Sequence, residues 1–264
     1  MLLSIITVNL NNKRGLQKTI DSVVSQNCKD FEWIIIDGGS EDGSKDLIEA
    51  YSDYITLWVS EKDLGIYDGM NKGILASKGD YILFLNSGDA LSNNNILSNI
   101  CSDINNVDII VYDILLHSEE KEVVKDLAHL KNLSVVSFLF TATFPHQSTL
   151  IKRDLFSKIG LYDINYRFVA DWIFFWKACI ENNASYIYKE GCILAIYDLD
   201  GISTKNREKA QAERYSFLLS LYPKRLYDYL RLSSKIDRDL ECTKRPFYHF
   251  LFKSLMWVSN KFPI

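Results

Sequence analysis

Residues 32–44 read EWIIIDGGSEDGS, and this stretch decides the fold. Its first half is a short apolar run rich in isoleucine, which is typical of a buried strand and stops at Asp37. A glycine-rich turn follows, and from about Ser44 the apolar residues Leu47, Ile48 and Tyr51 recur at helical spacing. A strand, a tight turn and a helix in this order form the repeating unit of an α/β sheet.

The same alternation extends in both directions from this stretch. It predicts four strands in the first part of the chain, at Leu3–Val8, Phe31–Ile36, Ile55–Val59 and Tyr81–Leu85, with helices between them that include Ile66–Ala76. Farther on, the pattern predicts strands at Val107–Leu116 and Ser148–Ile151 and helices at Leu130–Leu139 and Asp171–Glu181. The sequence therefore predicts an α/β fold whose sheet is flanked by helices.

The charge of the chain is distributed unevenly along its 264 residues. The net charge is −4, but residues 201–264 carry 13 Lys and Arg against 6 Asp and Glu, which leaves the first 200 residues at −11 and the tail at +7. An acidic body argues against nucleic acid as a partner, because phosphate contacts need clustered cations. We expect a domain over residues 1–204, with halves 1–100 and 101–204, and a helical tail over residues 205–264.

The tail and the cysteines bear on where the protein acts. The tail mixes cations with large aromatic side chains, so it suits either a helix at the surface of an anionic membrane or a helix packed on the domain. No cation precedes Lys13, which argues against a secretory signal. The five cysteines form no CxxC pair. We therefore expect a cytoplasmic protein, which the first of the two tail arrangements would place peripherally on the cytoplasmic face of the inner membrane.

Polar side chains follow the predicted strands at their carboxyl ends, where α/β sheets bind ligands. Thr7 and Asn9 follow the first strand, Asp37 the second, and the segment Asn86-Ser87-Gly88-Asp89 the fourth. A dinucleotide-binding loop is excluded because Ser40 stands where the second glycine of that motif is needed, and no Walker A motif is present.

A nucleoside diphosphate can also be held without a glycine cradle. A divalent cation that bridges its oxygens to a protein carboxylate is the arrangement that magnesium prefers, and Asp89 is placed to supply that carboxylate. Asp37 is placed to accept hydrogen bonds from a base or ribose. The alternatives are a turn aspartate at Asp37 and a helix cap at Asp89.

Five motifs occur in a fixed order and resemble a known family. They are SIITVN at residues 4–9, SVVSQ at 22–26, EWIIIDGGSEDGS at 32–44, EKDLGIYDGMNKGI at 61–74 and GDYILFLNSGD at 79–89. Together they resemble family-two glycosyltransferases, which have the GT-A fold, a mixed sheet flanked by helices. The resemblance is strong over residues 4–89 and continues more weakly to about residue 204.

The resemblance implies an enzyme that moves a sugar from a nucleotide sugar, such as a UDP-sugar, to an acceptor hydroxyl with inversion, using Mg²⁺ or Mn²⁺. It implies that Asp37 holds the uracil or the ribose. The usual Asp-x-Asp metal motif is replaced here, so only Asp89 offers a full negative charge, and Asn86 is left to bind ribose or to contribute a neutral oxygen. Lys72 and Arg167 are candidates to neutralise the diphosphate or are solvated cations.

The resemblance also implies a catalytic base at the start of a helix. The segment YRFVADW, residues 166–172, is similar to the acidic motif of the family, with Ala170 where many members have glutamate, so Asp171 is the available carboxylate. A helix N-cap is the alternative role for Asp171, and the two roles are compatible. His146 and Gln147 are expected to line the acceptor pocket, without a catalytic role for His146. Asp198 is a weaker candidate for a further ligand.

Similar bacterial enzymes that build surface polysaccharide of the O-antigen or colanic acid type imply a lipid-linked saccharide as the acceptor. Two other functions are alternatives to sugar transfer. A non-catalytic sugar-nucleotide-binding subunit would account for the weakened metal motif, but Asp37, Asp89 and Asp171 are all retained. A nucleotidyltransferase would need a glycine-rich phosphate loop after the first strand, and the segment at residues 9–15 is a poor match.

Overall fold

The computed structural model describes residues 3–101, 106–118, 122–127, 133–198, 206–224, 227–228 and 231–236. These residues form two compact units. The larger unit comprises the described parts of 1–127 and 143–217, and the smaller one those of 128–142 and 218–264. The predicted domain boundary between residues 204 and 205 falls outside the described residues and stays a prediction.

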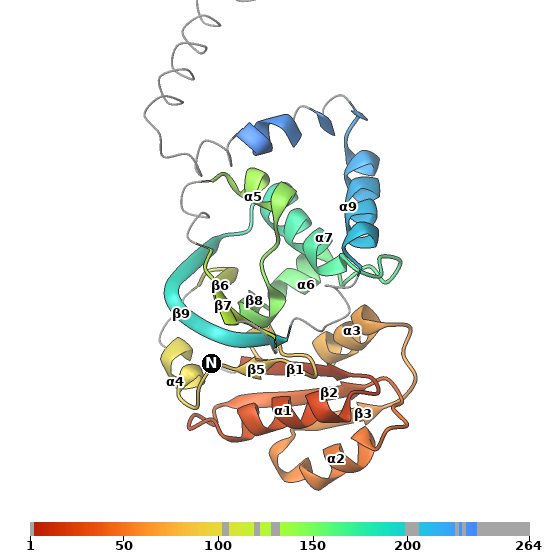
Figure 1. Ribbon diagram of the computed structural model, residues 1–264, viewed down its shortest axis with the longest axis vertical. Coiled ribbons are helices and arrows are strands. Elements are labelled where there is room, and N and C mark those ends of the chain that lie inside the picture. The colour runs from red at the N-terminus through yellow and green to blue at the C-terminus, as the bar shows by residue number, and fades with distance from the viewer. Residues whose placement is uncertain are drawn as a thin grey trace, which may run out of the picture. The chain divides into compact units, whose positions relative to one another are not determined.

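Four parallel strands form one side of the sheet in the larger unit, in the order β3-β2-β1-β4 (Figure 1). Their bounds are Leu3–Asn9 for β1, Phe31–Asp37 for β2, Leu57–Ser60 for β3 and Tyr81–Phe84 for β4. The connecting helices are α1 at Lys13–Val24, α2 at Ser44–Ala50, the short 3-10 helix η1 at Ser52–Tyr54 and α3 at Ile66–Ala76. The four predicted strands are confirmed, with small shifts at their ends, and α3 has the predicted bounds.

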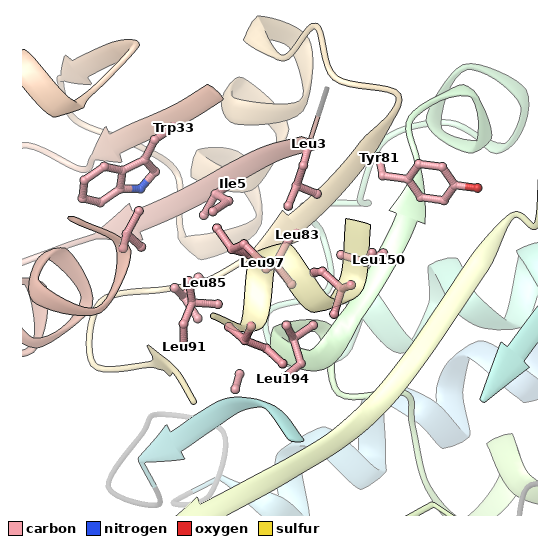
Figure 2. Close-up of a cluster of buried hydrophobic side chains, with 14 of the residues drawn as sticks. Leu3, Ile5, Trp33, Tyr81, Leu83, Leu85, Leu91, Leu97, Leu150 and Leu194 are labelled. Atoms are coloured by element: carbon pink, nitrogen blue, oxygen red, sulfur yellow. The ribbon is translucent and has the colours of Figure 1, made fainter. Parts of the chain in front are cut away.

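Alternate residues of β1 pack against helices on opposite faces of the sheet. Leu3 and Ile5 belong to a core cluster that includes Leu16 of α1 and Trp33 of β2, part of which Figure 2 shows. Residues such as Ile6 point to the other face, toward α3. A Cβ atom at Gly73 of α3 would lie 2.4 Å from the Ile6 side chain, so this glycine allows the close approach of helix and strand.

The second half of the larger unit adds strands that make the sheet mixed. The order continues from β4 through β8, β6 and β9 to β5, and β7 pairs with β6. The β4–β8 and β6–β8 pairs are antiparallel, whereas β6 and β9 are parallel. The bounds are Ala90–Leu91 for β5, Ile109–His117 for β6, Glu122–Lys125 for β7, Thr149–Lys152 for β8 and Tyr186–Asp198 for β9. The predictions for β6 and β8 are confirmed, whereas β5, β7 and β9 were not predicted.

The remaining helices of the larger unit position the second set of candidate residues. Helix α7 spans Ala170–Trp176 and continues as a π-helical turn over Lys177–Glu181, which confirms the predicted helix within one residue. A 3-10 turn at His146–Ser148, η3, precedes β8. The other helices are α4 at Ile96–Cys101, α6 at Asp154–Ile159 and α9 at Arg207–Leu221, which ends in the smaller unit.

In the smaller unit, α5 spans Val135–Thr141 and begins after Ser134, whose side chain accepts a hydrogen bond from the backbone N–H of Ser137. It overlaps the predicted helix at Leu130–Leu139, of which residues 130–132 are not described. The tail is helical over α9 and residues 231–236. Residues 237–264, which carry most of the proposed membrane-surface helix, lie outside the described residues. Within the described residues, no helix has the length and apolarity needed to cross a membrane.

Candidate active site

The carboxyl ends of β1 and β2 meet at a hydrogen-bonded carboxylate. The strand register places Asn9 opposite Asp37, and the Asn9 side-chain amide donates to Asp37 Oδ1 at 2.8 Å. Ser60, the last residue of β3, donates its hydroxyl to Oδ2 at 2.7 Å. Ser40 completes the set, since its hydroxyl donates to Oδ1 and its backbone N–H to Oδ2. The four acceptor sites of this carboxylate are therefore all used within the chain.

These bonds determine the charge of Asp37. The residue is completely buried. Burial by itself raises its pKa, but the hydrogen bonds from Ser40, Ser60 and Asn9 outweigh burial and hold the pKa below its ordinary value. Asp37 is therefore a fixed anion at neutral pH.

Thr7 does not lie where the sequence placed it. Strand β1 continues to Asn9, so Thr7 is inside the strand and not beyond its end, and its side chain is completely buried. Its hydroxyl accepts a hydrogen bond from the Trp33 indole N–H at 3.0 Å. The expectation that Thr7 lies beyond the first strand was wrong, because position 7 falls inside the predicted strand as well as inside β1, and its hydroxyl is used within the fold.

The second candidate carboxylate, Asp89, lies in the tight turn between β4 and β5. The turn is closed by a hydrogen bond of 3.0 Å from the Asp89 N–H to the Asn86 carbonyl. Burial raises the pKa of Asp89 to about 7, although His146, Lys18 and hydrogen bonds from the Asn86 backbone and the Gln147 side chain lower it. Since Asp89 is only 5% exposed, a cation at this carboxylate would displace a proton that burial favours.

Neutral oxygens complete the possible ligand set. Asn9 Oδ1 and Asn86 Oδ1 are buried atoms that have no hydrogen-bond partner among the described residues. Across those same residues, no three His, Cys, Asp or Glu side chains gather as a ready-made metal cluster. One carboxylate with the neutral oxygen of Asn86 in the same turn suits Mg²⁺ or Mn²⁺ bound largely through the phosphates of a ligand, so the residues present fit such an ion.

Asp171 lies in the first turn of α7, and both of its carboxylate oxygens accept hydrogen bonds. Tyr67 of α3 donates its hydroxyl to Oδ1 at 2.8 Å, and His146 Nδ1 lies 3.0 Å from Oδ2. Burial raises the pKa of Asp171, but the interactions with His146 and Tyr67 outweigh burial and lower it. The alternative of an N-cap is wrong, because Val169 occupies the cap position.

His146 joins this carboxylate to the turn of Asn86. Its second ring nitrogen, Nε2, lies 3.2 Å from the side-chain amide nitrogen of Asn86. The next residue, Gln147, hydrogen bonds to Asp89 and is 7% exposed. The structure therefore brings together five of the predicted residues, and sequence reasoning found each of them but none of the contacts between them.

The contacts described for Lys72 and Arg167 are with other residues than these five. Lys72 Nζ forms an ion pair with Glu61 Oε1 at 2.8 Å, which raises the pKa of Lys72, and lies 3.6 Å from Asp68. Arg167 is exposed, and its backbone N–H donates to Glu213. Asp198 is the last residue of β9, and its side chain is not described.

Two residues near Asp171 were not singled out from the sequence. Tyr67 stands inside the quoted motif at residues 61–74, which was the available signal. Burial and the neighbouring Asp171 raise its pKa well above the ordinary value, so its hydroxyl keeps its proton. The Arg214 guanidinium lies 5.1 Å from the ring centroid of Trp172, and burial lowers its pKa below the ordinary value although the charge of Asp171 opposes this shift. The sequence gives no indication that this one arginine of a helix lies near the candidate base.

Comparison with known proteins now gives the family. Residues 4–159 match the model described as Glycosyl transferase family 2, which is more than half of the chain. The chain belongs to this family. It is 29% identical over 220 residues to a PGL/p-HBAD biosynthesis glycosyltransferase of Mycobacterium bovis, covering 81% of this chain and 83% of that one. It is 30% identical over 210 residues to an uncharacterized glycosyltransferase of Mycobacterium tuberculosis, covering 78% and 79%.

Solved structures of glycosyltransferases share the fold. The mannosyltransferase PcManGT from Pyrobaculum calidifontis, in complex with GDP-Man and Mn²⁺, superposes with a TM-score of 0.66 at 12% identity over 97% of this chain and 80% of that one. S. aureus TarS 1–349 in complex with UDP gives a TM-score of 0.62 at 16% identity over 75% of this chain, which spans 60% of the TarS chain. The predicted GT-A fold of this family-two glycosyltransferase is thereby confirmed.

Proposed function

We propose that the chain is an inverting transferase that moves a sugar from a nucleotide sugar, specifically a UDP-sugar, to an acceptor hydroxyl. The observation that carries this proposal is the position of His146, which contacts both Asp171 and Asn86. Asn86 belongs to the turn of Asp89. The expected base and the expected donor-binding turn therefore adjoin through one side chain, as a transfer reaction requires.

The donor's nucleoside is assigned to the ends of β1 and β2. Asp37 has no spare acceptor site, so a base N–H or ribose hydroxyl must replace one of its present donors. The hydroxyls of Ser40 and Ser60 are the exchangeable ones, because they can rotate away. Asn9 and Asn86 add amide groups, and Lys72 is proposed to meet the diphosphate. The nucleotide contact at Thr7 stays a prediction, since its hydroxyl is bonded to Trp33.

Asp89 is the residue proposed to hold Mg²⁺ or Mn²⁺. A bound divalent ion neutralises the charge that develops on the departing nucleoside diphosphate. The Mn²⁺ in the PcManGT complex supports this assignment through the shared fold.

Asp171 is the carboxylate on which deprotonation of the acceptor depends. As the acceptor oxygen bonds to the anomeric carbon, the bond from that carbon to the diphosphate oxygen breaks on the opposite face, and the hydroxyl proton leaves toward Asp171. The Asp171 carboxylate accepts hydrogen bonds from Tyr67, from His146 and from the backbone of Trp172, which leaves one of its four acceptor sites for this proton.

The acceptor is proposed to meet the side of the site formed by His146 and Gln147. A lipid-linked saccharide of surface polysaccharide or O-antigen synthesis is the proposed class. Its support is the excess of cations and aromatic residues in the tail, which suits peripheral contact with an anionic inner membrane on its cytoplasmic face.

The purified protein, incubated with UDP-, GDP- and dTDP-sugars in Mn²⁺, tests the donor class by release of nucleotide. With the donor identified, we expect Asp171→Asn to lower sugar transfer by roughly 10²–10⁴-fold, the usual contribution of a positioned base. UDP affinity is expected to stay unchanged, because the new carbonyl still accepts from His146 and the new amide donates to the Tyr67 oxygen.

Asp154→Asn is the matched control, because Asp154 also stands in the first turn of a helix but is exposed. Normal transfer by Asp171→Asn would assign the base elsewhere. Binding of nucleotide sugar without any transfer or hydrolysis would instead support a non-catalytic binding subunit.

A further inference from the structure

The hydrogen bonds around Asp171 have only one consistent direction. Tyr67 donates to Oδ1, because its pKa is raised well above the ordinary value and it keeps its proton. Asp171 is charged, since its own pKa is lowered. A charged carboxylate only accepts hydrogen bonds, so the His146 nitrogen facing Oδ2 carries a hydrogen.

This direction determines the orientation of the next two groups. The group 3.2 Å from His146 Nε2 is the side-chain amide nitrogen of Asn86, which can only donate a hydrogen bond. Nε2 is therefore the acceptor of this contact, and Nδ1 is the ring nitrogen that donates to Asp171. The other end of that amide, Oδ1, is therefore turned away from the ring, and this buried oxygen has no hydrogen-bond partner among the described residues.

We propose that His146 is a positioning residue which, held by Asp171 and Tyr67, keeps the Asn86 amide turned so that Oδ1 accepts a hydrogen bond from a ribose hydroxyl of the donor nucleotide. The proposal rests on the proposed function, because it assumes that Asn86 meets the nucleotide. A buried acceptor without a partner costs free energy, and a ligand hydroxyl that reaches it recovers that cost.

The same chain of bonds gives a reason for asparagine at position 86. An aspartate there would set an acceptor against the lone pair of Nε2, unless the ring took a second proton. An asparagine offers a donor to Nε2 and still presents an oxygen. Asn86 and His146 are thus complementary as hydrogen-bond donor and acceptor. In this proposal, His146, 60 residues away, is the reason that asparagine stands where the family's Asp-x-Asp pattern has aspartate.

Calorimetric titration of UDP into four variants tests the pair. His146→Leu removes the acceptor for the Asn86 amide, so we expect UDP affinity to fall about fivefold to tenfold, the worth of one neutral hydrogen bond. Asn86→Ala is expected to cause the same loss, and the double variant no further loss. His146→Gln restores affinity, because a glutamine offers one donor to Asp171 and one acceptor to Asn86.

Nitrogen NMR of the imidazole provides a readout that a merely structural role does not move. The chain has four histidines, so the spectrum of His146→Gln identifies the signals of His146 by subtraction. We expect hydrogen on Nδ1 and a lone pair on Nε2 in the wild type at neutral pH, and hydrogen on both nitrogens in Asn86→Asp. Hydrogen on Nε2 alone in the wild type would overturn the proposal.

Further outcomes separate this proposal from the proposed function. Unchanged UDP affinity in His146→Leu, while Asn86→Ala loses affinity, would overturn the positioning role and leave nucleotide binding intact. Loss in Asn86→Ala that appears only with Mn²⁺ and not in EDTA would make Oδ1 a metal ligand and overturn the ribose assignment. If the wild type binds no nucleotide, the proposed function fails first. Thermal unfolding of His146→Leu and His146→Gln checks that both variants are folded.

Discussion

Two buried carboxylates stand at the same edge of the sheet, and their surroundings push their pKa values in opposite directions. Asp37 ends β2 and accepts four hydrogen bonds from the chain, which lower its pKa. Asp89 lies in the turn after β4, where burial outweighs its partners and raises its pKa to about 7. Both side chains are almost inaccessible, so burial alone does not explain the difference.

This difference in pKa shows which carboxylate the chain itself stabilises as an anion and which one requires a bound cation for that. Asp37 is stabilised as an anion before any ligand arrives, and it also fixes the turn at Ser40. Asp89 is a destabilised anion, and a cation would supply what its surroundings lack. Titratable groups whose environments separate their pKa values commonly have separate roles, so we assign Asp37 to the nucleoside and Asp89 to the metal.

Replacing Asp37, which accepts four hydrogen bonds, should cause the largest change in stability. Asp37→Ala leaves the hydroxyls of Ser40 and Ser60 and the Asn9 amide without their acceptor in a buried place. We expect a loss of about 3 kcal/mol in the free energy of unfolding by urea, and weaker UDP binding with or without metal. Asp21→Ala, at an exposed residue of α1, should change stability by less than about 0.5 kcal/mol. Full stability in Asp37→Ala would show that these bonds contribute nothing.

Replacing Asp89, whose pKa is raised, should change nucleotide binding and leave folding intact. Asp89→Ala removes the anion proposed to hold the metal, so UDP affinity in Mg²⁺ should fall roughly tenfold to a hundredfold, as for a lost charge-assisted contact. In EDTA the affinity should match that of the wild type. Equal losses in both conditions would remove Asp89 from the metal site.

The pH dependence of stability should separate the same pair. A raised pKa means that folded Asp89 holds a proton that the unfolded chain has released, so its contribution to stability falls as pH rises from about 4 to 7 and is constant above 7. The slope is about 1.4 kcal/mol per pH unit for one group. Asp37 has the opposite sign: its contribution is present above its ordinary pKa and is lost as pH falls below that value.

Metal-free unfolding of the wild type, compared with Asp89→Asn and with Asp37→Asn, measures each contribution separately. The difference between the wild type and Asp89→Asn should decline between pH 5 and 7. Added Mn²⁺ should restore stability to the wild type above pH 7 and not to Asp89→Asn. A flat difference across this range would show that Asp89 is ionised throughout.

The first four strands could be predicted because local signals agree there. Each strand is a short apolar run, and turn residues separate it from a helix with clear periodicity. Strand β9 gives no such signal. Gly191 interrupts it with a positive φ of 78°, and its N–H donates to Asp113 of β6 at 2.8 Å, where the strand register shifts. Strand β5 has two residues, and its partner is β9, so it depends on a distant segment.

The candidate site, like the fold, has features that local sequence signals predict and features that they do not. Asp37, Asn86 and Asp89 could be identified because each follows an apolar run or stands in a characteristic turn, and Asp171 because it stands in a motif similar to the family's at the start of a helix. The sequence could not show the bonds between candidates, since Tyr67 and Asp171 are 104 residues apart and meet only in the folded chain, where this bond joins the first turn of α3 to the first turn of α7. The sequence therefore predicts which residues form the site, and only the folded structure shows the hydrogen bonds between them.

The smallest effect is expected for a variant of Ser60, which tests how a ligand could bind to Asp37 when all four of its acceptor sites are already used. If a nucleoside group binds Asp37 Oδ2, the Ser60 hydroxyl must give up that place, because the four acceptor sites are filled. Ser60→Ala should then lower the free energy of unfolding by about 1 kcal/mol, the worth of one hydrogen bond, while UDP affinity stays equal or rises severalfold, since a competitor for Oδ2 is gone. Ser44→Ala is the control, because the Ser44 hydroxyl donates to Asp42 and not to Asp37. A fall in UDP affinity in Ser60→Ala would mean that the nucleoside needs this serine in place, and Asp37 would then act on the donor only by fixing the turn.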